Sequence, residues 1–128
     1  MALLAARPIV WLVLGGLLAC LAGLARADIL TVHAGESIGA AIAQARPGDE
    51  VRVERGLYRE NLRIDKPLTL KGIDRPTLSG GLTGDTIRIT AKDITIDGLI
   101  VRDSGDSLLD QNAGIYIQPG AHRAIVRN

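Results

Sequence analysis

Two stretches of the chain carry the same short pattern, and this repeat limits the possible folds more than any other feature. Residues 61–72 match residues 86–98 with one inserted residue, and residues 114–128 form a looser third copy. In each copy, two aliphatic residues flank a polar one, which is typical of a short β-strand with one buried face. Leu62, Ile87 and Ile115 hold equivalent positions, 25 and 28 residues apart. Self-similarity at this period indicates a solenoid, in which each turn covers the apolar face of its neighbour.

The content of a repeat decides which kind of solenoid it forms. No copy holds a helix of about 10–15 residues or a leucine-rich pattern, so helical and leucine-rich repeats are excluded. Each copy instead holds two or three short strands joined by Gly and Pro turns. We therefore predict an all-β fold, a right-handed parallel β-helix (solenoid) with a short N-terminal capping helix. A Greek-key sandwich stays open as an alternative, although its hairpins would not give aligned copies at this period.

The capping helix is predicted from an apolar stripe near the start of the chain. Ser37 is a good helix N-cap, and Pro47-Gly48 ends the pattern. The stripe falls at helical spacing on Ile38, Ala41, Ile42 and Ala45. Such a helix can cover the unpaired strand edges of the first coil.

Composition agrees with a narrow interior and excludes several classes of protein. Hydrophobic residues make up 47% of the chain, yet aromatic residues only 2%, with no Phe. Stacked short strands bury small aliphatic side chains, which accounts for this imbalance. The net charge of +1 gives no strong attraction to nucleic acid, so we expect no nucleic-acid partner. The single Cys excludes a disulfide framework and a zinc site of several thiolates.

The first 27 residues have the pattern of a secretory leader. Arg7 precedes an apolar run over residues 9–24, and Ala25-Arg26-Ala27 has the small residues of a cleavage site. We predict a signal peptide over residues 1–27, cleaved after Ala27, and a periplasmic protein. A membrane anchor is the rival, but the run is shorter than the roughly 20 residues needed to span. Lipidation at Cys20 is a second rival, although the apolar run continues past it.

The rest of the chain divides into two parts. Residues 28–48 are expected to form the N-terminal strand and the capping helix, and residues 49–128 the first coils of the β-helix. The sequence stops at Asn128 inside a repeat without a capping element. We therefore expect an N-terminal fragment of a longer protein, truncated at its C-terminus.

Several segments of the predicted coils resemble the NosD family, whose members are periplasmic maturation proteins of nitrous oxide reductase. Residues 41–49, 56–72 and 112–117 look like the start of these proteins. The more particular pieces are residues 83–89, 102–105 and 110–117. The Pro-Gly-Asp and Gly-x-Tyr-x-Glu-Asn pieces, in contrast, are common to many right-handed β-helix proteins.

The resemblance implies an accessory role. NosD-like proteins support assembly of the copper–sulfur centre of the reductase and are not known as enzymes. The implied partners are the permease and ATPase of an ABC transporter, nitrous oxide reductase and a copper chaperone lipoprotein. The alternative is a carbohydrate-active β-helix: a polysaccharide lyase, an epimerase or a binding module.

Copper binding is the first chemistry to test, and the sequence offers little for it. Cu(I) prefers thiolate and thioether ligands and accepts imidazole. Residues 28–128 contain no Cys or Met, so the weak metal candidates are His33 and His122. One site usually needs three or more ligands, which favours exposed or structural histidines here. No cofactor is expected in this part of the protein, although copper is possible in the full-length chain, with ligands beyond Asn128.

Three other groups of residues are candidates for function. The turn with Asp103, Asp106 and Asp110 could bind Ca²⁺ or cleave polysaccharide, although Asp and Ser also favour turns. Tyr58 and Tyr116 are few for a sugar-binding groove. No motif of a known catalytic site is present, so we predict no catalytic residue.

Three arginines alternate with aliphatic residues and should point outward: Arg52, Arg63 and Arg88. Arg63 and Arg88 occupy the same repeat position, so they should stack on one face. That face could dock an acidic partner. It could equally be a solvated surface, balanced by Glu54, Asp65 and Asp85, and surface charges usually are.

Overall fold

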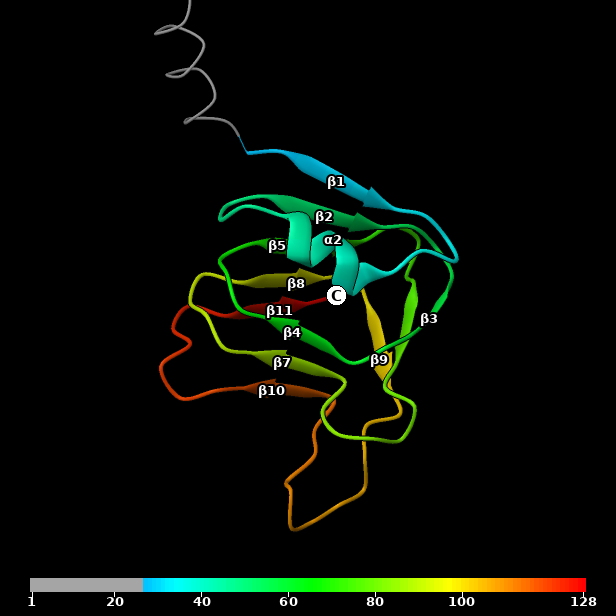
Figure 1. The fold of residues 1–128 in the computed structure, drawn as a ribbon, viewed down its shortest axis with the longest axis vertical. Helices are drawn as coiled ribbons and strands as arrows, with labels where there is room; N and C mark the ends of the chain where they lie inside the picture. The colour runs from blue at the N-terminus through cyan, green and yellow to red at the C-terminus, as the bar shows by residue number, and fades with distance from the viewer. Residues whose placement is uncertain (1–26) are drawn as a thin grey trace, which may run out of the picture.

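The computed structural model describes residues 27–128. The predicted leader before Ala27, including Cys20, lies outside the described residues. The described part holds eleven strands and one helix (Figure 1). In chain order these are β1 (Ile29–Val32), α2 (Ile38–Gln44), β2 (Glu50–Val53), β3 (Leu57–Arg59), β4 (Leu62–Ile64), β5 (Thr69–Gly72), β6 (Thr77–Ser79), β7 (Ile87–Ile89), β8 (Thr95–Asp97), β9 (Ile100–Arg102), β10 (Ile115–Ile117) and β11 (Ile125–Arg127).

The strands form three parallel sheets that run along the length of the molecule (Figure 1). We name them sheet A (β1-β2-β5-β8-β11), sheet B (β3-β6-β9) and sheet C (β4-β7-β10). Each turn of the chain contributes one strand to A, then B, then C, and the next turn pairs with it in parallel. The predicted parallel β-helix is confirmed.

The strand register confirms the repeat alignment read from the sequence. Leu62, Ile87 and Ile115 pair across sheet C. The matching set in sheet A also pairs, and consists of Leu70, Ile96 and Val126.

Sheet B is the part of the fold that the aliphatic triplets did not reveal. The middle residues Tyr58 of β3 and Leu78 of β6 are buried; both flanking residues of β3 are exposed, whereas in β6 Ser79 is buried as well. A three-residue strand of this kind has one inward position, so it lacks the aliphatic-polar-aliphatic signature of sheets A and C.

The interior between the sheets is filled by aliphatic side chains. Ile64, Leu70, Leu78, Ile87 and Ile89 are fully buried. Tyr58 is the one aromatic ring among the buried residues of the described part, and its hydroxyl donates to the Glu54 carbonyl at 2.7 Å. The described coils therefore enclose a packed core and not a ligand channel.

Helix α2 caps the first coil, as predicted. Ser37 is the N-cap, and its Oγ accepts a hydrogen bond from the Ala40 N–H at 3.1 Å. Ile38 and Ile42 are buried on the side of the helix that packs on β1, β2 and β4. The helix thus covers the end of the core that strands cover elsewhere.

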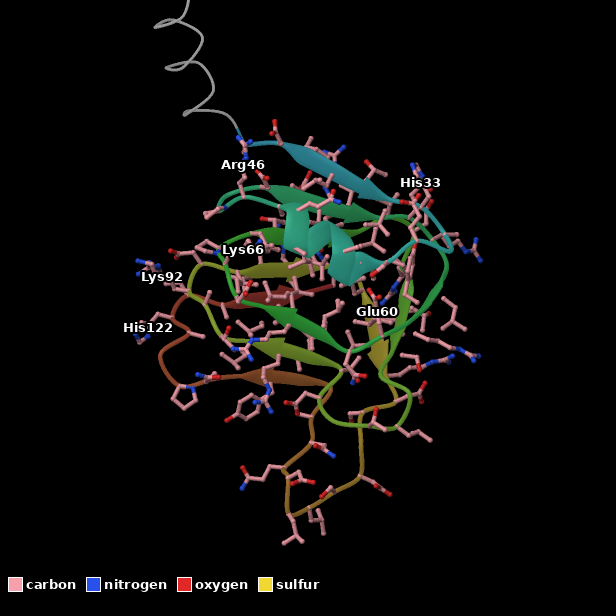
Figure 2. The ribbon with its side chains drawn as sticks, viewed as in Figure 1. His33, Arg46, Glu60, Lys66, Lys92 and His122 are labelled. Carbon is pink, nitrogen blue, oxygen red and sulfur yellow. The ribbon has the colours of Figure 1, made fainter. Side chains whose placement is uncertain are left out.

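Two side chains of the coil beneath hold the two ends of α2 (Figure 2). Glu60, before β4, accepts from the Gly39 N–H at 2.8 Å and the Ser37 hydroxyl at 2.9 Å. Lys66, after β4, donates to the Ala45 carbonyl at 2.9 Å. Glu60 lies at the N-terminus of the helix and Lys66 at its C-terminus, so both charges interact favourably with the helix dipole.

Gly39 is a position where the helix can be strengthened. A Cβ there would meet its nearest atoms at 3.6–3.9 Å, which is ordinary contact. Because alanine loses less backbone entropy than glycine in a helix, Gly39→Ala should raise the free energy of unfolding by about 0.5–1 kcal/mol. Urea denaturation measures this gain. A loss of stability would show that the helix is not packed as described.

Candidate interaction surfaces

The two histidines lie at different corners of the solenoid (Figure 2). His33 follows β1, and its Nδ1 lies 2.8 Å from a carboxylate oxygen of Glu54, which raises the pKa of the imidazole. His122 lies in the turn between β10 and β11. The structure therefore does not bring the two imidazoles together. No group of three potential metal ligands converges anywhere in residues 27–128.

Two of the three aspartates of the acidic turn, Asp103 and Asp110, form side-chain hydrogen bonds or ion pairs within the protein. Asp103 accepts from the Ser79 hydroxyl at 2.7 Å and pairs with Arg102 at 3.2 Å. Asp110 accepts from the Ser107 hydroxyl at 2.8 Å, while its own N–H donates to the Ser107 oxygen at 3.2 Å. The Ser107–Asp110 bonds are those by which Asp and Ser shape turns, whereas the Ser79–Asp103 bond joins residues 24 apart in the sequence. The carboxylates of Asp103 and Asp110 face separate partners.

The outer face of sheet C carries the arginine column expected from the repeat. Arg63, Arg88 and Tyr116 pair in register across β4, β7 and β10. Arg88 donates through Nε and Nη2 to Asp85, at 2.9 and 2.7 Å, and lies 5.0 Å from the centre of the Tyr116 ring. The predicted stacking of Arg63 with Arg88 is confirmed, and Asp85 is the expected counter-ion.

Arg52 lies on a different face from Arg63 and Arg88, and it pairs with none of the three carboxylates named from the sequence. It belongs to β2 of sheet A and donates to Glu50 at 2.7 Å. Glu54 pairs with His33 instead. Neighbours two apart on a strand share a face, whereas Glu54 follows β2 at the corner.

Polar side chains at the corner before sheet C join successive coils. Asn61 donates to the carbonyls of Thr83 and Asp85, at 2.7 and 2.8 Å. One coil further, Asp85 accepts from the Ala113 N–H at 2.9 Å. Asn61 was not among the residues predicted from the sequence, although its place directly before an aliphatic triplet is a usable signal.

Asp49 of the Pro-Gly-Asp segment ties the start of sheet A to the end of the helix segment. Its two carboxylate oxygens accept from the N–H groups of Asp28 at 2.9 Å and Arg46 at 2.7 Å. Asp49 is buried, with only 4% of its surface exposed. The N–H donors of Arg46 and Asp28 hold the pKa of the Asp49 carboxyl below its usual range.

This depressed pKa predicts acid sensitivity. The Asp49 carboxylate stabilises the fold at neutral pH, and its contribution is lost as the pH falls through the lowered pKa. Asp49→Asn should unfold at a lower temperature than wild type at pH 7, and the difference should narrow below pH 4. Thermal unfolding from pH 7 to pH 3 measures this, with Asp65→Asn at an exposed carboxylate as control. A constant difference across that range would contradict the assignment.

The outer face of sheet B was not predicted from the sequence, and arginines outnumber carboxylates around it. The positions on either side of the inward residue of each strand form two columns in register across β3, β6 and β9. One column is Leu57, Thr77 and Ile100, and the other is Arg59, Ser79 and Arg102.

The two tyrosines offer little to a sugar ring. Tyr58 is buried, and the ring of Tyr116 has the Arg88 guanidinium against it.

No helix of the described part is both long and apolar enough to span a bilayer.

The described residues thus form a parallel β-solenoid with a packed interior, hydrogen bonds between successive coils at its corners, and charged outer faces.

The chain is 31% identical over 100 residues to the "Probable ABC transporter binding protein NosD" of Pseudomonas aeruginosa. The match covers 70% of this chain and 23% of that protein. The similarity and the solenoid together make this chain a NosD-like β-helix. It spans about a quarter of the length of the curated relative it matches. No protein-family model matches the chain, and no solved structure matches it significantly.

Proposed function

We propose that the protein is a periplasmic accessory factor in maturation of the copper–sulfur centre of nitrous oxide reductase, working with an ABC transporter. The observation that carries the proposal is the similarity to a NosD described as an ABC transporter binding protein. The proposed partners are the transporter permease and ATPase, the reductase and a copper chaperone lipoprotein.

The architecture leaves the outer faces of the solenoid as the place where a partner can bind. The core of the described coils is filled by aliphatic side chains, so a partner must bind an outer face. The sheets keep these faces in fixed register, which gives rigid columns of outward side chains. Such columns suit the recognition of other proteins.

Export is part of the proposal, with cleavage after Ala27. Ala27 and Asp28 are exposed, so a peptidase can reach the bond between them. The backbone nitrogen of Asp28 lies 2.9 Å from Asp49. After cleavage that nitrogen becomes an ammonium, and its pairing with Asp49 would hold the new N-terminus against the first coil.

This cleavage is directly measurable. Intact-mass analysis and N-terminal sequencing of the protein from the periplasm should give a chain that begins at Asp28. A chain that begins at Met1, or a lipid-modified chain that begins at Cys20, would contradict cleavage after Ala27.

Deletion of the gene in its own host tests the function. The strain should still export the reductase but lose nitrous oxide reduction, and a plasmid copy of the full-length gene should restore it. Because the proposal concerns maturation, the amount of exported reductase serves as the control. An active reductase in the deletion strain would refute the proposal. Purified full-length protein should also leave the ultraviolet absorbance of uronate polymers unchanged, whereas a rise would favour a lyase.

A further inference from the structure

The outer face of sheet B carries more positive charge than the two nearby carboxylates, Asp74 and Asp103, neutralise. Among residues 27–128, Arg55, Arg59 and Arg75 are exposed and form no ion pair. Arg102 is exposed and shares Asp103 with Ser79. This face therefore attracts anionic groups.

The other two sheets neutralise much of their outward charge. Arg88 of sheet C pairs with Asp85 at 2.7 Å. In sheet A, Arg52 pairs with Glu50 at 2.7 Å and Arg127 with Asp97 at 3.2 Å. Arg63 of sheet C also forms no ion pair within the described residues, so what distinguishes sheet B is that three such arginines lie on or beside one face: Arg55, Arg59 and Arg75.

Two hollows lie side by side on this face and share Arg102. The first is about 460 Å³ and is lined by Gly56, Leu57, Thr77 and Ile100, with the charged side chains of Arg55, Asp74, Arg75 and Arg102. The second is lined by Arg59, Ser79, Gly81, Leu82, Arg102 and Asp103, so the two hollows together hold four arginines and two aspartates. Leu57 and Ile100 are 46% and 41% exposed, so apolar surface lies directly beside the guanidinium groups.

We propose that this face binds an extended acidic segment of a partner protein. One apolar side chain of the segment would enter the hollow over Leu57 and Ile100, and a carboxylate would bind between Arg59 and Arg102. The proposal goes beyond the proposed function, because it rests on the charge and shape of this face and not on the identity of the partner.

The spacing of the two columns matches an extended polypeptide. Leu57 and Arg59 stand two residues apart on β3, as do Ile100 and Arg102 on β9. Side chains two apart in an extended chain lie on the same side, roughly 6.6 Å from each other. A segment that runs along the strand direction therefore places residue i over one column and residue i+2 over the other. The expected pattern is Leu-x-Asp.

The apolar column favours a polypeptide over other anions. A free phosphate has no apolar surface to bury against Leu57 and Ile100, and the hydroxyl-rich rings of a polysaccharide offer less than an aliphatic side chain does. A membrane surface would need apolar side chains that project beyond the charges, whereas these two lie on the sheet between longer arginines.

Fluorescence anisotropy tests the proposal with the full-length mature protein. The probe is a labelled eight-residue peptide that repeats Ser-Leu-Ser-Asp, and its Asn counterpart is the neutral control. Arg59→Glu should weaken binding about tenfold or more, whereas Arg63→Glu, at an exposed arginine of sheet C, should change it less than about twofold. Arg59→Ala is a milder second variant. Circular dichroism should show that all three variants keep the wild-type fold.

Several outcomes would overturn the inference. They are no binding of the acidic peptide, equal binding of the neutral peptide, and equal losses in the Arg59→Glu and Arg63→Glu variants. Two alternative anions are tested in the same way: phosphatidylglycerol vesicles and polygalacturonate. If either one bound in an Arg59-dependent manner while the acidic peptide did not bind, a protein segment would not be the occupant of this face.

Discussion

Replacing Gly72 with alanine is expected to lower the free energy of unfolding by about 3 kcal/mol or more, the upper range for overpacked sites. Gly72 ends β5, where the chain turns from sheet A towards sheet B. A Cβ on it would lie 2.3 Å from the Gly98 carbonyl oxygen and 2.8 Å from Cδ of Pro76. The first of these is backbone of the next coil, so relief requires the stacked coils to separate.

Gly114→Ala is the matched control for this loss. Its new Cβ would meet only a methyl of Val101, at 3.8 Å. Chemical denaturation of both variants gives the comparison. A Gly72→Ala protein as stable as Gly114→Ala would show that successive coils do not approach as closely as described.

Truncation of Ile89 to alanine is expected to lower the free energy of unfolding by about 2–5 kcal/mol. Ile89 is fully buried in β7, the middle strand of sheet C, and pairs in register with Ile64 of β4 and Ile117 of β10. The lost methyl groups would leave a cavity that the neighbouring coils cannot close, because their backbones are fixed by sheet hydrogen bonds.

Ile89→Val gives a graded comparison at the same site. It removes a single methyl group and should cost about 0.5–1.5 kcal/mol. Urea unfolding of the two variants, with unchanged slopes, measures both losses. Equal effects of the two substitutions, or no effect of either, would place Ile89 outside the packed core.

The sequence predicted sheets A and C because aliphatic-polar-aliphatic triplets lie in or beside most of their strands. Leu62 and Ile64 show this pattern in β4, and Ile87 and Ile89 repeat it in β7. Sheet B escaped prediction because its strands have one inward residue each, as with Tyr58. A single buried residue between exposed ones does not differ from a loop in sequence.

The surfaces were predictable only where they followed the repeat. Arg63 and Arg88 lie in matching positions of matching triplets, so their stacking could be derived. Arg59 and Arg102 share a column, but they lie 43 residues apart in segments with no visible alignment. The hydrogen bond from the Gly39 N–H to Glu60 depends on how α2 packs against the coil, and the local sequence pattern does not determine that packing.

A role in building the copper–sulfur centre is tested most directly by the sulfide content of nitrous oxide reductase purified from the gene-deletion strain. The reductase should be exported in normal amount but lack the acid-labile sulfide of that centre, and the full-length gene should restore it. Reductase with wild-type sulfide content in the absence of this protein would contradict the role.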